Sequence, residues 1–204
     1  MIRLLGKIPE TIGVAVSGGI DSMVALDFIQ NSRRDIKVIH VNHGTDHAPE
    51  ALKFVREQAE QRGLEFFINR EDVYTSDIKT NKEAAWRNMR YEYFHSFPFP
   101  IITAHHLDDC LETWLFSSFN GKPKTIPYQR NNVIRPFLLT KQEDIVDYAY
   151  QNDVDYIYDM SNSDLSYMRN YIRHNIVPDA LTINPGIHKM IAKLVEKRYG
   201  NPIS

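Results

Sequence analysis

The sequence of 204 residues has a single cysteine, Cys110, and no long apolar run. One thiol excludes an intramolecular disulfide framework and any Cys-x-x-Cys metal or redox pair. No apolar run approaches the length that spans a membrane, and residues 1–6 lack the hydrophobic core of a secretory signal. These absences predict a cytoplasmic protein with no membrane association.

An excess of charge of one sign is missing as well. The chain has 24 Lys and Arg against 26 Asp and Glu, which gives a formal net charge of −2. A net charge this small does not by itself indicate a nucleic-acid partner. Locally, the stretch from His188 to Arg198 carries four Lys or Arg against one Glu, a pattern that the solvated face of a terminal helix also produces.

Two common phosphate-binding motifs are absent too. The chain has no Gly-x-x-x-x-Gly-Lys-Ser/Thr and no Gly-x-Gly-x-x-Gly, which leaves a Walker P-loop and a dinucleotide fingerprint unsupported. It does have Ser17-Gly18-Gly19-Ile20-Asp21-Ser22, between a short buried β run and an amphipathic helix. A helix that begins there directs free N–H groups and its positive dipole end at the loop, which predicts a phosphate site. The alternative is an ordinary strand-to-helix turn, because Ser, Gly and Asp are common turn residues.

Strand-like and helix-like segments alternate along the first 120 residues. Extended runs are expected near 14–16, 36–41, 64–68 and 101–104, and helices between them at about 21–29, 49–61, 81–94 and 108–119. The alternation predicts an α/β fold with a Rossmann-like parallel sheet of about five strands and helices on both faces. Because ligands bind at the carboxyl ends of such strands, we expect the loops after residues 16, 41 and 104 to meet at one site.

The C-terminal part of the chain is less regular. Residues 120–132 are rich in turn residues and predict a mobile loop, and 154–158 is the candidate fifth strand. Thr140 and Glu143 form a capping-box pattern for a helix that reaches about Asn152. Further helices are expected at 165–175 and at 185–199, the latter capped by Asn184. We therefore expect one domain over residues 1–160 and a short helical C-terminal extension over 161–204 that packs on it.

A second polar cluster lies where the fourth strand turns into a helix. It reads His105-His106-Leu107-Asp108-Asp109, with Glu112 one turn later. Asp108 and Glu112 are four residues apart, so both carboxylates lie on one helical face. Such carboxylates hold Mg²⁺ on ATP or recognise an ammonium group, and the residues alone leave both roles open. Acidic residues also simply stabilise a helix N-terminus.

Arginines form two more helical pairs, Arg87 with Arg90 and Arg169 with Arg173. Spacings of three and four residues place each pair on one face of a helix. The guanidinium group matches phosphate and carboxylate geometry better than any other side chain, although exposed arginines are often only surface charges.

These motifs resemble those of known enzymes. Residues 17–22 resemble the pyrophosphate loop (PP-loop) of N-type ATP pyrophosphatases, and the order of motifs over about residues 12–185 is similar to that of tRNA(Ile)-lysidine synthetases. The motifs that carry the second resemblance are His40-Val41-Asn42-His43, Arg87…Arg90-Tyr91, His105-His106-Leu107-Asp108-Asp109…Glu112-Thr113, Arg135-Pro136, and Asp159-Met160-Ser161-Asn162…Arg169-Asn170…Arg173.

The resemblance implies an ATP-dependent ligase with Mg²⁺ as its metal. Such an enzyme adenylates the C2 oxygen of cytidine 34 in a tRNA with a CAU anticodon, and the ε-amine of free L-lysine then attacks C2 and expels AMP. The implied catalytic residues are Asp21, Asp108, Glu112 and Arg87. ATP would bind Ser17, Gly18, Gly19, Ile20, Asp21, Ser22, His43 and His105, with Asp21 at the metal. Lysine would bind Asp108 and Glu112, and tRNA or phosphate would bind Arg169, Arg173, Lys193 and Lys197.

The chain departs from that family at three places. Thr45-Asp46 stands where a Leu-Arg pair is usual, and only Gly121 remains of a glycine-rich loop. The sequence also stops just beyond the catalytic domain, so we expect the domain itself to hold tRNA, with a homodimer as one arrangement. The alternatives are a PP-loop tRNA thiolase, which the single cysteine disfavours, an amidating ATP pyrophosphatase, and a degenerate nucleotide- or RNA-binding module.

Overall fold

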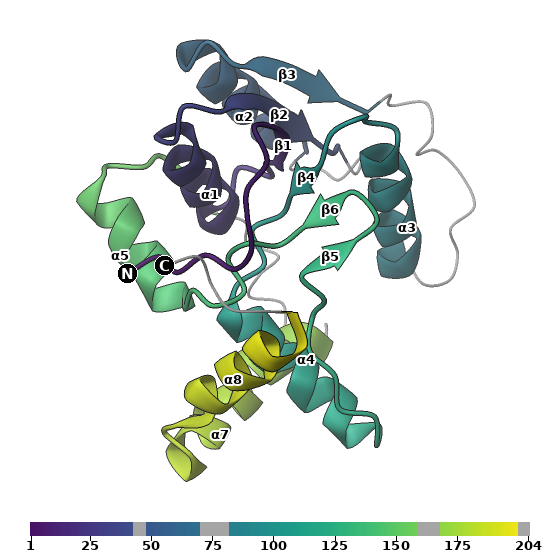
Figure 1. Ribbon diagram of the computed structural model, residues 1–204, viewed down its shortest axis with the longest axis vertical. Helices are drawn as coiled ribbons and strands as arrows, with labels where there is room; N and C mark the ends of the chain where they lie inside the picture. Colours follow the sequence, from purple (N-terminus) through teal and green to yellow (C-terminus); the bar gives the residue numbers. More distant parts are fainter. Residues whose placement is uncertain (43–47, 70–81, 159–167, 200–204) are drawn as a thin grey trace.

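The computed structural model describes residues 1–42, 48–69, 82–158 and 168–199. Its centre is a sheet with the strand order β3-β2-β1-β4-β6-β5, in which only β5 is antiparallel to its neighbour (Figure 1). The strands are β1 (Thr11–Ala15), β2 (Asp35–His40), β3 (Glu65–Ile68), β4 (Ile101–Ile102), β5 (Gln129–Arg130) and β6 (Val133–Ile134). The predicted α/β fold with a largely parallel sheet is confirmed.

Successive side chains of the strands point to opposite faces and build two cores. Val14, Val38 and Ile102 face one core, which α1 (Ile20–Gln30), α2 (Ala48–Gln61) and α5 (Gln142–Gln151) cover. Their neighbours Ile39 and Ile101 face the other core, which Tyr91 and Phe94 of α3 (Lys82–His95) complete. Helices therefore lie on both faces of the sheet, as the sequence predicts.

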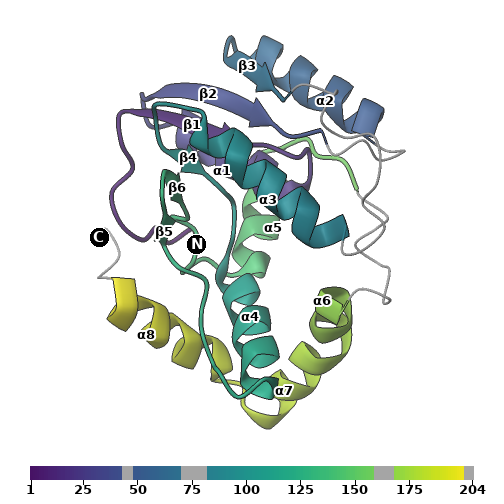
Figure 2. The same ribbon diagram turned by 90° about the vertical axis from the view of Figure 1, so that its right-hand side faces the viewer.

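The remaining helices gather around α4 (Leu107–Phe119), which extends away from the sheet (Figure 2). They are α6 (Met168–Tyr171), the π-helical segment η3 (Ile172–Ile176), α7 (Val177–Ile183) and α8 (Ile187–Tyr199). A third apolar core joins α4 to η3 and α8. The helical C-terminal segment thus packs on the same unit. The domain boundary expected at residue 160 lies outside the described residues and stays a prediction.

Two of the predicted extended or loop segments are wrong. Residues 154–158 form no strand, because the segment runs behind the PP-loop, where the Ile157 N–H donates a 2.9 Å hydrogen bond to the Gly18 carbonyl. The hairpin of β5 and β6 begins inside the predicted loop 120–132 and supplies the fifth and sixth strands of the sheet instead.

Two predicted helix caps are wrong as well. The Thr140 hydroxyl donates to the Arg3 carbonyl and accepts the Arg3 N–H, so it ties down the N-terminal segment, and α5 begins later, at Gln142. Asn184 accepts the Gly186 N–H, but α8 begins only at Ile187, so Pro185 precedes the helix. In both places the predicted capping side chain makes a different contact, and the helix begins later in the chain than the local pattern predicts.

The topology places the carboxyl ends of β1 and β4 next to each other. From β1 the chain moves outward to β2 and β3, then returns to the other side of β1 for β4. Ligands bind at such a switch point in open parallel sheets. The loops after residues 16 and 104 do meet there, whereas the loop after residue 41 enters 43–47, outside the described residues.

Candidate functional site

Gly18 allows the turn of the PP-loop between β1 and α1. Its φ is +97°, in the left-handed region that favours glycine, and a Cβ atom there would lie 2.9 Å from Cδ1 of Ile157. The Gly18 carbonyl in turn accepts the Ile157 N–H. Any larger residue at position 18 would therefore strain the backbone and displace the segment that supports the loop.

Two serines close the same loop. The Ser22 hydroxyl donates to the Gly19 carbonyl at 2.9 Å and accepts the Ser17 N–H at 3.1 Å, and the Ser17 hydroxyl accepts the Gly19 N–H at 3.4 Å. Gly19 is the N-cap of α1, and its carbonyl accepts the Ser22 and Met23 N–H groups, so the N–H groups of Ile20 and Asp21 are left without intrahelical partners. The loop is thus preorganised to receive the oxygens of a phosphate chain.

Asp21 stands beside this loop with one oxygen unsatisfied. Its Oδ1 is buried without a hydrogen-bond partner, and its Oδ2 lies 3.8 Å from Nε2 of His106. Burial raises the pKa of Asp21, while the nearby His106 opposes that shift. A buried carboxylate oxygen without a protein partner is a suitable ligand for a hard cation such as Mg²⁺.

The two adjacent histidines, His105 and His106, have different surroundings and different charges. His106 is 1% exposed and lies within 3.8 Å of three carboxylates, those of Asp21, Asp108 and Asp109. Burial opposes protonation, but these carboxylates raise the pKa of His106 to about 9, so the ring is a cation at neutral pH. His105 contacts the Thr103 hydroxyl instead, and burial lowers its pKa to about 3, so it is neutral.

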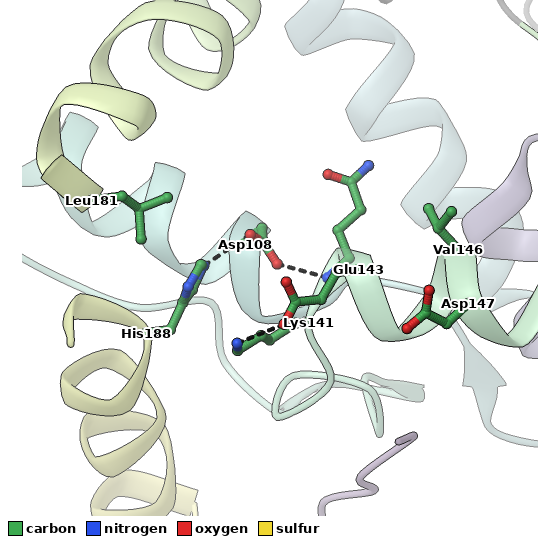
Figure 3. A pocket seen from close by; sticks show the side chains of 8 residues that line it. Asp108, Lys141, Glu143, Val146, Asp147, Leu181 and His188 are labelled. Carbon is green, nitrogen blue, oxygen red and sulfur yellow. Dashed lines mark hydrogen bonds and ion pairs between the residues drawn. The ribbon is translucent and has the colours of Figure 1, made fainter. Parts of the chain in front are cut away.

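Asp108 joins α4 to the first residue of α5 and to α8 (Figure 3). Its Oδ1 lies 2.9 Å from Nε2 of His188 on α8, and its Oδ2 accepts the Gln142 N–H at the start of α5. Burial opposes ionisation, yet the nearby positive charge of His106 and the hydrogen bonds with His188 and Gln142 hold the pKa of Asp108 well below its usual range. Both oxygens are therefore occupied, at the edge of a cavity of about 410 Å³ that also contacts Lys141, Glu143, Val146, Asp147 and Leu181.

Asp109 and Glu112 form a quartet with Arg169 and Arg173, which we call the charge quartet. Nε of Arg169 donates to Glu112 at 2.9 Å, and Nε of Arg173 donates to Glu112 at 2.6 Å. Both arginines also donate to Oδ1 of Asp109. Burial alone would lower the pKa of each arginine, but the carboxylates raise it. The side chains of Glu112 and Asp109 are only 3% and 10% exposed. Their two negative charges are balanced by the two positive charges of the arginines.

The structure therefore does not bring Asp108 and Glu112 to one shared partner. Sequence reasoning placed His106 and Asp109 in the polar cluster but gave neither a role of its own, and it left out His188. Asp109 lies three residues before Glu112, a spacing that shares a helical face as well as four does, so this signal was available in the sequence. His188 is 80 residues from Asp108 in the chain, and no local pattern connects them.

The other predicted residues lie further out or outside the described ranges. Arg87 is exposed on α3, with its guanidinium carbon 5.1 Å from the centre of the Tyr91 ring. Lys193 and Lys197 are exposed on α8. His43 lies among the residues that are not described, as does Asp159-Met160-Ser161-Asn162.

Some alternatives lose support within the described residues. They contain no group of three or more His, Cys, Asp and Glu that could hold a metal ion on protein ligands alone. Cys110 is buried, and burial raises the pKa of its thiol to about 12, so it is not a ready nucleophile. Within the same ranges, no helix is long and apolar enough to cross a membrane.

Comparison with known proteins agrees with the geometry of the loop. The model of the PP-loop domain family matches residues 4–180. The chain is 34% identical over 203 residues to the tRNA(Ile)-lysidine synthase of Thermosipho africanus, across 92% of this chain and 48% of that protein. It is 35% identical over 198 residues to the enzyme of the same name from Staphylococcus epidermidis, across 87% of this chain and 45% of that protein.

The chain spans about half the length of the curated relatives it matches. Among solved structures, the NH3-dependent NAD synthetase from Campylobacter jejuni superposes with a TM-score of 0.49 at 13% identity, over 94% of this chain and 86% of that one.

Proposed function

The chain belongs to the PP-loop domain family, and we propose that it is the catalytic part of an enzyme that joins L-lysine to cytidine 34 of a tRNA with a CAU anticodon. The name of its curated relatives, tRNA(Ile)-lysidine synthase, supports this activity. The observation that carries the proposal is the combination of a preorganised PP-loop with two buried carboxylates that are paired with two guanidinium groups.

The reaction takes two steps. In the first, the C2 oxygen of the cytidine attacks the α-phosphorus of ATP, the bond between the α- and β-phosphates breaks, and pyrophosphate leaves. In the second, the ε-amine of lysine attacks C2, the bond between C2 and oxygen breaks, and AMP leaves with that oxygen. The attacking nitrogen gives up a proton as the C–N bond forms, which gives lysidine.

The first step belongs to the PP-loop. The backbone N–H groups of Gly18, Gly19 and Ile20, with the hydroxyls of Ser17 and Ser22, receive the phosphates. Asp21 with its unpartnered Oδ1 would hold Mg²⁺ together with phosphate oxygens, and the ion would neutralise the departing pyrophosphate. His106, a cation 3.8 Å from Asp21, adds a positive charge next to the same phosphates.

The second step uses the charge quartet for recognition of lysine. Free lysine carries an α-ammonium and an α-carboxylate, which match the carboxylates of Asp109 and Glu112 and the guanidinium groups of Arg169 and Arg173. Exchange of internal ion pairs for those of the ligand leaves no buried charge unpaired. Bound in this way, lysine keeps its ε-amine free to reach the cytidine. Asp108, whose oxygens are occupied, acts as a positioning residue at the start of α4.

The decisive experiment is a product assay. The protein is incubated with ATP, Mg²⁺, L-lysine and a CAU-anticodon tRNA transcript, and the nuclease digest is examined for lysidine by mass spectrometry, with AMP and pyrophosphate measured in parallel. Asp21→Asn removes a metal-facing charge and little packing, so we expect it to abolish all three products while the fold is retained. Pyrophosphate formation by the wild type without tRNA, and no lysidine with it, would refute the proposal.

Lysine analogues test the quartet separately. Cadaverine lacks the α-carboxylate, and 6-aminohexanoate lacks the α-ammonium, while both keep the terminal amine. If the quartet holds the amino-acid end of lysine, each analogue needs a concentration at least about tenfold higher, because charge-assisted hydrogen bonds are lost. Equal use of cadaverine and lysine would show that only the amine is recognised.

The proposed activity also indicates where in the cell the protein acts. Its tRNA substrate and ATP are found in the cytoplasm, so we place the chain there. Homodimer formation stays a prediction, and light scattering on the purified chain with and without tRNA tests it.

A further inference from the structure

Three arginines converge on the ring of Tyr91, on the face of the sheet that α3 covers. The guanidinium carbons of Arg87 and Arg130 each lie 5.1 Å from the ring centre, and an Nη atom of Arg135 donates to the Tyr91 hydroxyl at 2.7 Å. We call these four residues the arginine array. They come from α3, from β5 and from the residue after β6, so the tertiary fold assembles the array (Figure 1).

Among the described residues, the array has no compensating negative charge. In the part of the chain that the structure describes, none of its three arginines forms an ion pair with a carboxylate. Arg135 is 1% exposed, its other hydrogen bond goes to the Pro127 carbonyl, and its Nε has no partner. A buried cation without an anion is costly, so this charge favours a negative group nearby.

The exposed members of the array give that negative group a place to bind. Arg87 and Arg130 are both exposed, and stacking on Tyr91 holds their guanidinium planes in place, which lowers the entropy cost of binding. The array is also next to the segment that leads into the site, because Arg135 follows β6 and Thr103 follows the adjacent β4, and the Thr103 N–H donates to the Ile134 carbonyl at 3.1 Å. The phosphates of ATP have their own loop between β1 and α1.

We propose that Arg87 and Arg130, aligned on Tyr91 and supported by Arg135, bind the phosphodiester backbone of the RNA substrate. The inference rests on the proposed function, since it names the surface that holds the tRNA next to the target base. Guanidinium groups bind phosphate oxygens with two parallel hydrogen bonds, and contacts of this kind position RNA without reading its sequence.

The test compares Arg130→Gln with a matched control. Arg56 on α2 is also exposed and also stacks on an aromatic ring, with its guanidinium carbon 5.4 Å from the centre of Phe66, but it lies on the opposite face of the sheet. Arg56→Gln therefore removes the same charge and the same type of contact elsewhere. Binding of a CAU anticodon stem-loop RNA is measured by fluorescence anisotropy at several salt concentrations for the wild type and both variants.

We expect Arg130→Gln to weaken RNA binding about fivefold and to lower the slope of log affinity against log salt by about one, since one phosphate contact is lost. Arg56→Gln should bind as the wild type does, and Arg87→Gln with Arg130→Gln should lower the slope by about two. Wild-type affinity and slope in Arg130→Gln, or an equal loss in Arg56→Gln, would overturn the inference.

Failure of the proposed function gives a different result. If the wild type forms no lysidine but Arg130→Gln still weakens RNA binding selectively, the array stands as an RNA site of another PP-loop enzyme. If the wild type forms lysidine and Arg130→Gln binds RNA normally, the array is not the RNA-binding surface, and the proposed function is still supported.

Discussion

The charge quartet and the arginine array both bring arginine side chains together, but the groups that surround those positive charges differ. In the quartet, Arg169 and Arg173 meet Asp109 and Glu112 within hydrogen-bond distance. In the array, Arg87, Arg130 and Arg135 share a neutral tyrosine and form no ion pair among the described residues.

The difference indicates two kinds of ligand. A balanced set of charges suits a small zwitterion, which brings both signs and can replace internal pairs one for one. An unbalanced positive set suits a polyanion, which brings only negative charge and whose binding weakens as salt is added. The nature of the neighbouring residues, and not the number of arginines, therefore supports the proposal of a different ligand for each cluster.

The largest expected effect comes from unbalancing the quartet. Glu112→Gln leaves two guanidinium groups facing one carboxylate, so we expect the KM for lysine to rise about 10- to 100-fold while the KM for ATP stays within about twofold. The same variant should bind RNA more tightly at low salt, because the quartet now resembles the array. Steady-state kinetics and anisotropy measure both, with Glu57→Gln on α2 as the control for loss of an exposed carboxylate. A parallel rise in the KM for ATP would move Glu112 to the nucleotide.

A second, smaller effect is expected from cations that belong to neither cluster. Lys193→Glu with Lys197→Glu on α8 should weaken binding of all tRNAs about tenfold and leave the preference for cytidine at the wobble position intact. The measurement compares stem-loops with CAU and UAU anticodons at several salt concentrations. Lys7→Glu with Lys53→Glu, an equal change of charge at exposed sites, is the control. Unchanged affinity would restrict RNA binding to the array.

Asp108 lies on α4 with Asp109 and Glu112 but is not part of the quartet, so its replacement tests a stabilising role and not a binding role. Its pKa is lowered in the folded protein, so its ionised form adds stability above the ordinary aspartate pKa of 3.8 and loses it as the pH falls below that value. We expect Asp108→Asn to be less stable than the wild type by about 1–3 kcal/mol near pH 7. Urea unfolding from pH 7 to pH 3 should show this gap narrowing in acid. A gap that is constant with pH would mean that the charge is not what holds α4, α5 and α8 together.

The smallest effect on binding is expected from the tyrosine hydroxyl. Tyr91→Phe keeps the ring under Arg87 and Arg130 but leaves the Arg135 Nη without its acceptor, so RNA affinity should change less than about twofold while stability falls by about 1–3 kcal/mol. Thermal unfolding and anisotropy separate the two. A loss of RNA affinity larger than that of Arg130→Gln would make the hydroxyl, and not the arginines, the RNA contact.

The fold and the PP-loop were predictable because their signals are local. Residues 14–22 contain the strand, the two glycines and the helix start in one stretch, and hydrophobic period separates strands from helices. Residues 154–158 misled the same reasoning, since β-branched and aromatic residues favour a strand, yet the Ile157 N–H of this segment donates to a loop carbonyl and not to a neighbouring strand. The two-residue strands β5 and β6 are too short to show a period.

The site was predictable in its residue types but not in its pairing. The sequence identifies two histidines, three carboxylates and two arginine pairs. Which histidine turns inward, and which carboxylates meet Arg169 and Arg173 about 60 residues later, depends on how α4 packs against η3 and α8. The array was missed for a similar reason, because Tyr91, Arg130 and Arg135 come from three separate elements.

The hydrogen bond between Ile157 and Gly18 has a consequence for the synthesis of the chain. Ile157 follows Gly18 by 139 residues, so a chain growing on the ribosome makes its nucleotide loop early and receives the support for it late. At about 5–20 residues per second, the interval is on the order of ten seconds. During that time β1 and α1 can form, but the loop between them lacks the hydrogen bond from Ile157 that supports it. A nascent chain halted before residue 157 should therefore bind nucleotide less well than one released just beyond it.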